Sequence, residues 1–208
     1  PGYQGEGDLM DKDELLLNIS DKDTIQNHLT FMALYIALYE NFTATFVENV
    51  KSFLCDLGIK DGKLNYRETP VYREKIKNRV VDQKGNKDVL KATMLWLQDE
   101  GAMSEQDYSD FLEIKSIRNN YAHEMPRLII EGVPLENIPW FFKLLDLYGK
   151  LDKWWINEIE LPISGVVLPG TYDESDVENA MLSAFKSVIV SLYRNDDILK
   201  TKVDGEKA

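Results

Sequence analysis

Residues 21–57, DKDTIQNHLTFMALYIALYENFTATFVENVKSFLCDL, carry the strongest structural signal in the chain. Between Ile25 and Leu57, apolar residues recur at alternating intervals of four and three residues, and Thr43 is the one polar residue of the series. A spacing of about 3.5 residues is typical of a long helix that packs against other helices along a seam. Polar residues at 20–23 offer N-terminal caps, and Gly58 is a natural C-terminal stop. We therefore predict one long helix between these two signals.

The rest of the chain shows the pattern of further helices joined by turns. Gly101 should end one helix, and Ser104 with Asp107 should form an approximate capping box at the start of the next. Pro126 should limit that next helix at its far end. The helices are predicted over about 71–81, 88–100, 104–125, from between Pro134 and Pro139 to about 159, and over 174–194, with a turn at 84–86 and a loop over 161–172.

Strand signals are almost absent, so we predict an all-α protein. Its core should be an antiparallel helical bundle over residues 20–159. Residues 1–19 should form an acidic N-terminal extension. Residues 160–208 should form a loop, an extra C-terminal helix that packs on the bundle, and a disordered tail.

The charge and composition of the chain limit its partners. Its 24 Lys and Arg residues against 36 Asp and Glu residues give a net charge of −12, which argues against a general nucleic-acid coat or a protein of the membrane surface. No apolar run approaches the ~20 residues that span a bilayer, and no signal peptide is visible, so we expect a cytoplasmic protein without a membrane partner. A lone cysteine, Cys55, excludes a disulfide within the chain and a cysteine-based metal site.

Positive charge is concentrated in residues 60–91, which we call the basic segment. It holds ten basic and five acidic residues within an acidic chain. Such a segment can present a surface that attracts phosphate groups. The other interpretation is a solvated connector, because runs of charge usually face water.

Residues 117–124 read IRNNYAHE and contain the best candidate for proton chemistry. The chain has only two histidines, and histidine is the side chain that most readily exchanges protons near neutral pH. On a helix, Asn119 and His123 are one turn apart on one face, whereas Arg118 and His123 are ~140° apart. Arg118 falls within the apolar arc, where an arginine needs a partner. That arc comprises Phe111, Ile114, Ile117, Tyr121, Ala122 and Met125.

Two structural interpretations stay open for these residues. Arg118 could pair with a carboxylate from another helix, and His123 could be a hydrogen-bonded structural residue. The other histidine, His28, lies between apolar stripes of the long helix, where a structural role is expected. Only the long side chain of Arg118, or a second copy of the helix across a dimer interface, could bring Arg118 and His123 together.

The run Arg118-Asn119-x3-His123 resembles the Arg, four-to-six residues, His signature of HEPN domains, and the helical setting over about 21–155 is similar as well. The resemblance implies an antiparallel helical bundle that dimerises and brings two motifs to a cleft between protomers. Many HEPN domains are metal-independent ribonucleases, often toxins or antiviral effectors, in which the RNA 2′-hydroxyl attacks the adjacent phosphate. It further implies that His123 is the general acid or base, that Arg118 binds the scissile phosphate, and that Asn119 orients His123 or contacts the phosphate.

The partners that follow from this resemblance are an RNA substrate, a second copy of the chain, and an antitoxin or regulatory protein. No metal and no cofactor is expected. Lys75, Lys77 and Arg79 of the basic segment are the candidate RNA contacts. The alternative is a catalytically silent module with a HEPN fold that serves dimerisation or binds a nucleotide or a protein. Met125 stands where one subgroup of the family carries a modified tyrosine, so that form of regulation is not expected.

Overall fold

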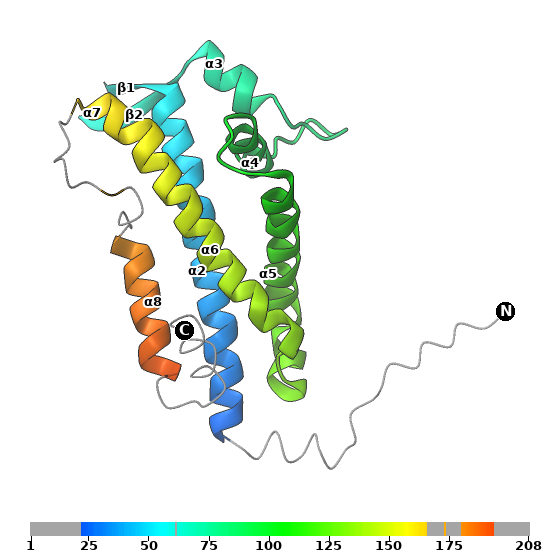
Figure 1. Ribbon diagram of the computed structural model, residues 1–208. Coiled ribbons are helices and arrows are strands. Elements are labelled where there is room, and N and C mark those ends of the chain that lie inside the picture. Colours follow the sequence, from blue (N-terminus) through cyan, green and yellow to red (C-terminus); the bar gives the residue numbers. More distant parts are fainter. Residues whose placement is uncertain (1–21, 61, 166–172, 174–179, 194–208) are drawn as a thin grey trace. The chain divides into compact units, whose positions relative to one another are not determined.

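The computed structural model describes residues 22–60, 62–165, 173 and 180–193, and the chain forms two compact units, residues 1–144 and 145–208. The fold class is all-α, as predicted, with one two-stranded sheet in the part of the chain that the structure describes. In chain order the elements are α2 (Lys22–Leu54), β1 (Cys55–Lys60), β2 (Lys63–Glu68), α3 (Pro70–Tyr72), the π-helical turn η1 (Arg73–Lys77), α4 (Val89–Asp99), α5 (Glu105–Glu131), the 3₁₀ turn η2 (Leu135–Asn137), α6 (Ile138–Trp155), the π-helical turn η3 (Ile156–Glu160), α7 (Leu161–Ser164) and α8 (Ala180–Tyr193) (Figure 1).

The core of the first unit is built on α2 and α5, which run side by side in opposite directions (Figure 1). Aromatic rings from the two helices interlock. The rings of Tyr35 and Tyr121 meet edge to face with centroids 5.1 Å apart, and those of Phe42 and Phe111 lie 6.2 Å apart. The first residues of α6 join this core, because the Phe141 ring lies 6.0 Å from that of Tyr35.

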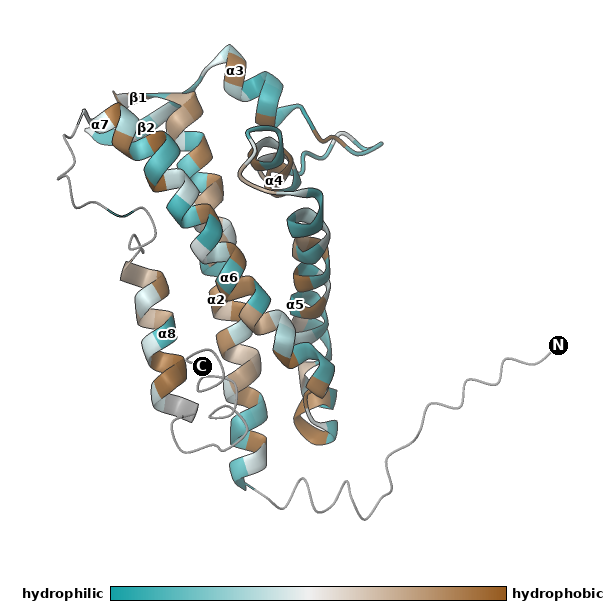
Figure 2. Ribbon diagram, viewed as in Figure 1, coloured by the Kyte–Doolittle hydropathy of each residue, from teal (hydrophilic) through white to brown (hydrophobic). Residues whose placement is uncertain are grey.

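The predicted seam of the long helix is confirmed in its middle. Each helix carries hydrophobic and hydrophilic residues together (Figure 2), and the hydrophobic stripe of α2 is the buried one. Leu29 and Phe53, near the two ends of the seam, are exposed. The buried apolar residues of the seam and of the helix face beside it are Met32, Tyr35, Leu38, Tyr39, Phe42, Phe46 and Val50.

The predicted stop at Gly58 is wrong, because α2 ends at Leu54 and the chain continues as a hairpin. Strands β1 and β2 pair in antiparallel register, with Leu57 opposite Tyr66. The Thr69 hydroxyl donates a hydrogen bond of 2.5 Å to the Leu54 carbonyl, which satisfies one of the free acceptors at the helix end. A contact from outside the helix thus ends it, and Gly58 lies within a strand.

The predicted stop at Gly101 and the predicted capping box at Ser104 are confirmed at the two helices that follow, and the structure adds a cap at Asp88. The Asp88 side chain accepts a hydrogen bond of 2.8 Å from the Lys91 amide at the start of α4, and Gly101 follows its end with a φ of 80°. At α5, the Asp107 amide donates to the Ser104 hydroxyl at 3.1 Å, and the Ser104 amide donates to the Asp107 carboxylate at 2.7 Å. This reciprocal pair is the predicted capping box.

Pro126 does not end α5, contrary to the prediction. The helix continues to Glu131 and ends at Gly132, whose φ of 92° favours glycine. A proline within a helix removes the hydrogen bond to the carbonyl four residues earlier, here that of Ala122. Both residues are exposed, so water can satisfy the carbonyl. The placement of Ala122 on the buried arc is therefore wrong as well.

The second unit, residues 145–208, begins within α6. Its α8 contacts α6, since a Cβ atom at Gly149 would lie 3.5 Å from the Leu182 side chain. Residues 161–164 are helical, where a loop was predicted. The predicted acidic extension at 1–19 and the predicted tail after 193 lie outside the described residues, and packing of the C-terminal helix on the bundle stays a prediction. None of the helices in the described ranges is long and apolar enough to cross a membrane.

Removal of the α5 cap tests this local account of the fold. In Ser104→Ala the hydroxyl that accepts from the Asp107 amide is lost, so the free energy of unfolding should fall by about 1 kcal/mol in urea denaturation followed by circular dichroism. Ser116→Ala is the matched control, because Ser116 is exposed in the middle of α5 and alanine has the higher helix propensity. Equal effects of the two substitutions would contradict the cap.

Candidate functional site

Arg118 lies at the contact between α5 and α2. Its side chain is 28% exposed and forms an ion pair with Glu40 of α2 through Nη2 and Oε1. Its Cζ atom lies 5.7 Å from the centre of the Tyr39 ring, a cation–π distance. One of the two alternatives from the sequence is therefore observed, because Arg118 pairs with a carboxylate from another helix.

Asn119 connects Arg118 to the exposed side of α5. Its Oδ1 atom accepts a hydrogen bond of 3.1 Å from Arg118 Nη1. His123 follows one helical turn later, exposed, and it forms no hydrogen bond or ion pair with another described residue. The interpretation of His123 as a hydrogen-bonded structural residue does not fit this position. The structure thus joins Arg118 to Asn119 and leaves the imidazole open to a ligand.

Burial controls the electrostatics next to Arg118. Tyr39 is buried, and this burial raises the pKa of its hydroxyl to about 12, although the charge of Arg118 opposes the rise. Burial raises the pKa of Tyr121 to about 12 as well. The Arg118 Nε atom is buried without a hydrogen-bond partner in the described part of the chain. On its interior side Arg118 therefore faces tyrosines that stay neutral, and its charged atoms lie toward the rim of the core.

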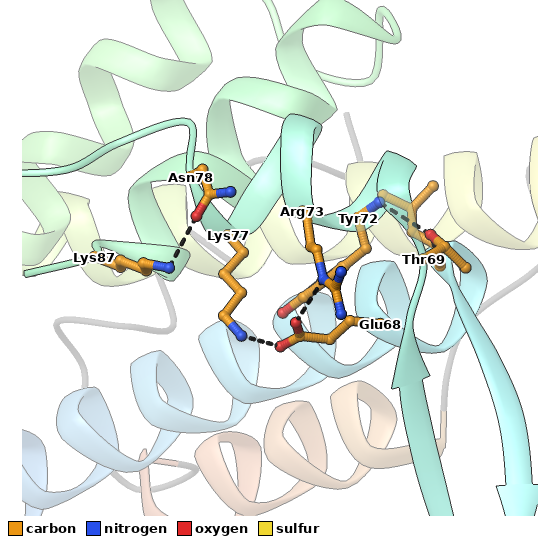
Figure 3. Close-up of polar contacts among 8 residues, drawn as sticks. Glu68, Thr69, Tyr72, Arg73, Lys77, Asn78 and Lys87 are labelled. Atoms are coloured by element: carbon orange, nitrogen blue, oxygen red, sulfur yellow. Dashed lines mark hydrogen bonds and ion pairs between the residues drawn. The ribbon is translucent and has the colours of Figure 1, made fainter.

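Half of the ten cations of the basic segment have a hydrogen-bond partner for their side chain in the described part of the chain, and Figure 3 shows three of these, Arg73, Lys77 and Lys87. The Glu68 carboxylate accepts from Lys77 and, at 3.2 Å, from Arg73. These hydrogen bonds, that of Lys77 foremost, hold the pKa of Glu68 below its usual range. Arg79 pairs with Asp99 at 2.7 Å. Of the three predicted RNA contacts, Lys77 and Arg79 therefore have carboxylate partners, and Lys75 is exposed.

The structure does not bring the basic segment to His123 within one chain. Arg79 is bound to the last residue of α4, and α4 lies beside the start of α5 (Figure 1). His123 lies 18 residues after the first residue of α5, which corresponds to about 27 Å along a helix axis. An RNA that contacts both places has to extend along the length of α5.

The other polar candidates have structural surroundings. His28 packs against the end of α5, where a Cβ atom at Gly132 would lie 3.1 Å from the His28 ring. Asp107 is part of the capping box, and Asp110 pairs with Lys143 at 2.9 Å. Within the described ranges, no group of three or more His, Cys, Asp or Glu side chains could hold a metal ion.

Glu40 and Tyr39 are the site residues that the sequence did not reveal. Both lie in α2, 78 or more positions before Arg118 in the chain. Glu40 is the first charged residue after the apolar run at 31–39, and this is the one signal that marked it. The pairing with Arg118 could not be inferred, because it depends on how far α5 is shifted along α2.

Comparison with protein-family models, curated proteins and solved structures found no match to this chain. The resemblance to HEPN domains therefore stays a prediction from the motif at Arg118–His123 and from its helical setting.

Alkaline titration tests the burial of the tyrosines around Arg118. Both Tyr39 and Tyr121 have a folded-state pKa of about 12, above the ordinary value of 10.0. The unfolded chain thus loses these protons first, so their stabilising effect is complete below pH 10 and is lost as the pH rises toward 12. Urea denaturation should show the free energy of unfolding falling there by up to about 1.4 kcal/mol per pH unit for each tyrosine. Tyr39→Phe should reduce this slope, and an unchanged slope would contradict the burial of its hydroxyl.

Proposed function

We propose that this chain is a metal-independent endoribonuclease of the HEPN type that cleaves RNA by attack of the 2′-hydroxyl. The observation that carries the proposal is the arrangement on α5. Arg118 and Asn119 are hydrogen-bonded to each other at 3.1 Å, and His123 is exposed one turn beyond Asn119. A guanidinium that can bind phosphate and an imidazole that can exchange protons thus lie on one helix segment.

The reaction needs two proton transfers and stabilisation of charge on the phosphate. A base removes the proton of the 2′-hydroxyl as its oxygen bonds to phosphorus. The bond from phosphorus to the 5′-oxygen breaks, and an acid gives that oxygen a proton. The products are a 2′,3′-cyclic phosphate and a 5′-hydroxyl. His123 serves the proton transfers, and Arg118 stabilises the negative charge on the non-bridging oxygens.

A second copy of the chain completes this scheme. One exposed imidazole per protomer supplies one proton-transfer group at a time, so a homodimer with facing α5 helices would supply a base and an acid together. The proposal accordingly includes a cytoplasmic homodimer that acts as a toxin or an antiviral effector and is controlled by an antitoxin or regulatory protein.

A second candidate function has observations of its own in its favour. Glu40 neutralises Arg118, and the basic segment lies at the opposite end of α5 with two of its candidate contacts paired. These features favour a catalytically silent HEPN-fold module that serves dimerisation or binds a nucleotide or protein. Such a module would not depend on the imidazole of His123.

The test of the proposed activity is RNA cleavage by the purified chain with analysis of the new ends. The wild type should produce cyclic-phosphate and 5′-hydroxyl ends without added metal, and His123→Ala should lower the rate by about 10²–10⁴-fold. Because His123 is exposed, the free energy of unfolding of this variant should lie within about 0.5 kcal/mol of the wild-type value. Asn120→Ala, an exposed neighbour on the same helix, is the matched control and should cleave normally.

Expression in cells separates the two candidate functions. If the chain is a ribonuclease that acts as a toxin, expression of the wild type should slow growth and expression of His123→Ala should not. Equal growth with both proteins, together with no cyclic-phosphate ends in either RNA sample, would rule out the nuclease and leave the interaction module.

A further inference from the structure

Arg118 can offer a ligand only its two terminal nitrogens. Its Nε atom is buried and has no hydrogen-bond partner among the residues described. Nη1 donates to Asn119 Oδ1 at 3.1 Å, and Nη2 donates to the Glu40 carboxylate. Phosphate groups bind arginine best through two parallel hydrogen bonds from neighbouring nitrogens. An incoming phosphate therefore has to use nitrogens that Asn119 and Glu40 already contact.

The difference in exposure between the paired side chains decides which of them can move. The Glu40 side chain is 52% exposed, against 28% for Arg118. Arg118 is also held over the Tyr39 ring at 5.7 Å. An ion pair at this level of exposure adds little to stability. The Glu40 carboxylate can consequently turn into solvent while the guanidinium keeps its position.

The two acceptors on Arg118 differ in charge, and this difference affects an anionic ligand. Asn119 is neutral and does not repel a phosphodiester. Glu40 carries a carboxylate that would lie next to the phosphate and repel it. Because the carboxylate belongs to the same chain and already contacts Nη2, it competes for Arg118 without the loss of translational freedom that an incoming ligand suffers.

We propose that Glu40 is a built-in competitor of the RNA phosphate, which occupies Arg118 in the free chain and is displaced when RNA binds. The inference rests on the proposed function, since it takes Arg118 as the contact to the scissile phosphate. It assigns to α2 a regulatory residue for a site whose other members lie on α5. A ligand with a single weakly held phosphate is disfavoured, and a polyanionic RNA strand overcomes the competitor by its additional phosphate contacts.

The test measures binding of a short labelled single-stranded RNA by fluorescence anisotropy, with every variant in a His123→Ala background that slows cleavage by about 10²–10⁴-fold. Glu40→Gln should bind about two- to fivefold more tightly, as expected for the loss of a partly exposed charge pair. Glu48→Gln is the matched control for net charge, because Glu48 lies eight residues further along α2 and pairs with Lys51. With Arg118→Ala present, Glu40→Gln should have no more effect than Glu48→Gln.

Cleavage kinetics with His123 intact give a second readout that a purely structural role would not produce. Glu40→Gln should lower KM by the same two- to fivefold factor and leave kcat unchanged, since the competition acts on ground state and transition state alike.

Each outcome decides between the proposals. If Arg118→Ala weakens RNA binding and Glu40→Gln strengthens RNA binding no more than Glu48→Gln does, then Glu40 is not a competitor of RNA. Arg118 keeps its assigned role in that case. If Arg118→Ala binds RNA as tightly as the His123→Ala parent does, or if no variant binds RNA, both the proposed competition by Glu40 and the proposed function are wrong. Tighter binding by Glu40→Gln that depends on Arg118 supports both.

Discussion

The packing of α2 against α5 is the contact on which the rest of the first unit depends. Large rings from both helices interlock, with Tyr35 against Tyr121 and Phe42 against Phe111. Burying such side chains contributes on the order of 1.5–3 kcal/mol each. Because close-packed rings fit in one arrangement only, they also set how far α5 is shifted along α2. This shift places Glu40 beside Arg118.

The same contact determines the chemistry that is available at the motif. An arginine on a helix face that packs against another helix is costly unless it finds a charged partner and further contacts. Here Glu40 supplies the charge, Tyr39 the ring and Asn119 a neutral acceptor. Arg118 therefore stays at the rim of the core with its charge accessible, and His123 remains outside it. The packing that stabilises the unit thus also controls how strongly Arg118 can attract an anion.

Predictions from the sequence succeeded where the physical cause is local. The stop at Gly101, the capping box at Ser104 and the seam of α2 depend on residues within about one helical turn, so the spacing alone reveals them. The hairpin was missed and Pro126 was misjudged because the outcome there depends on other contacts. Thr69 satisfies the end of α2, and exposure of Ala122 leaves its freed carbonyl to water.

The all-α class, the long apolar seam and the candidacy of Arg118 and His123 follow from the order of residues in a chain with two histidines. The pairing of Arg118 with Glu40, the exposure of His123 and the position of the basic segment at the far end of α5 follow from the packing of the helices. The two groups differ in the distance along the chain over which their causes act. Helix formation and capping act over three or four residues, whereas Arg118 and Glu40 are 78 residues apart and meet only through the alignment of two packed helices.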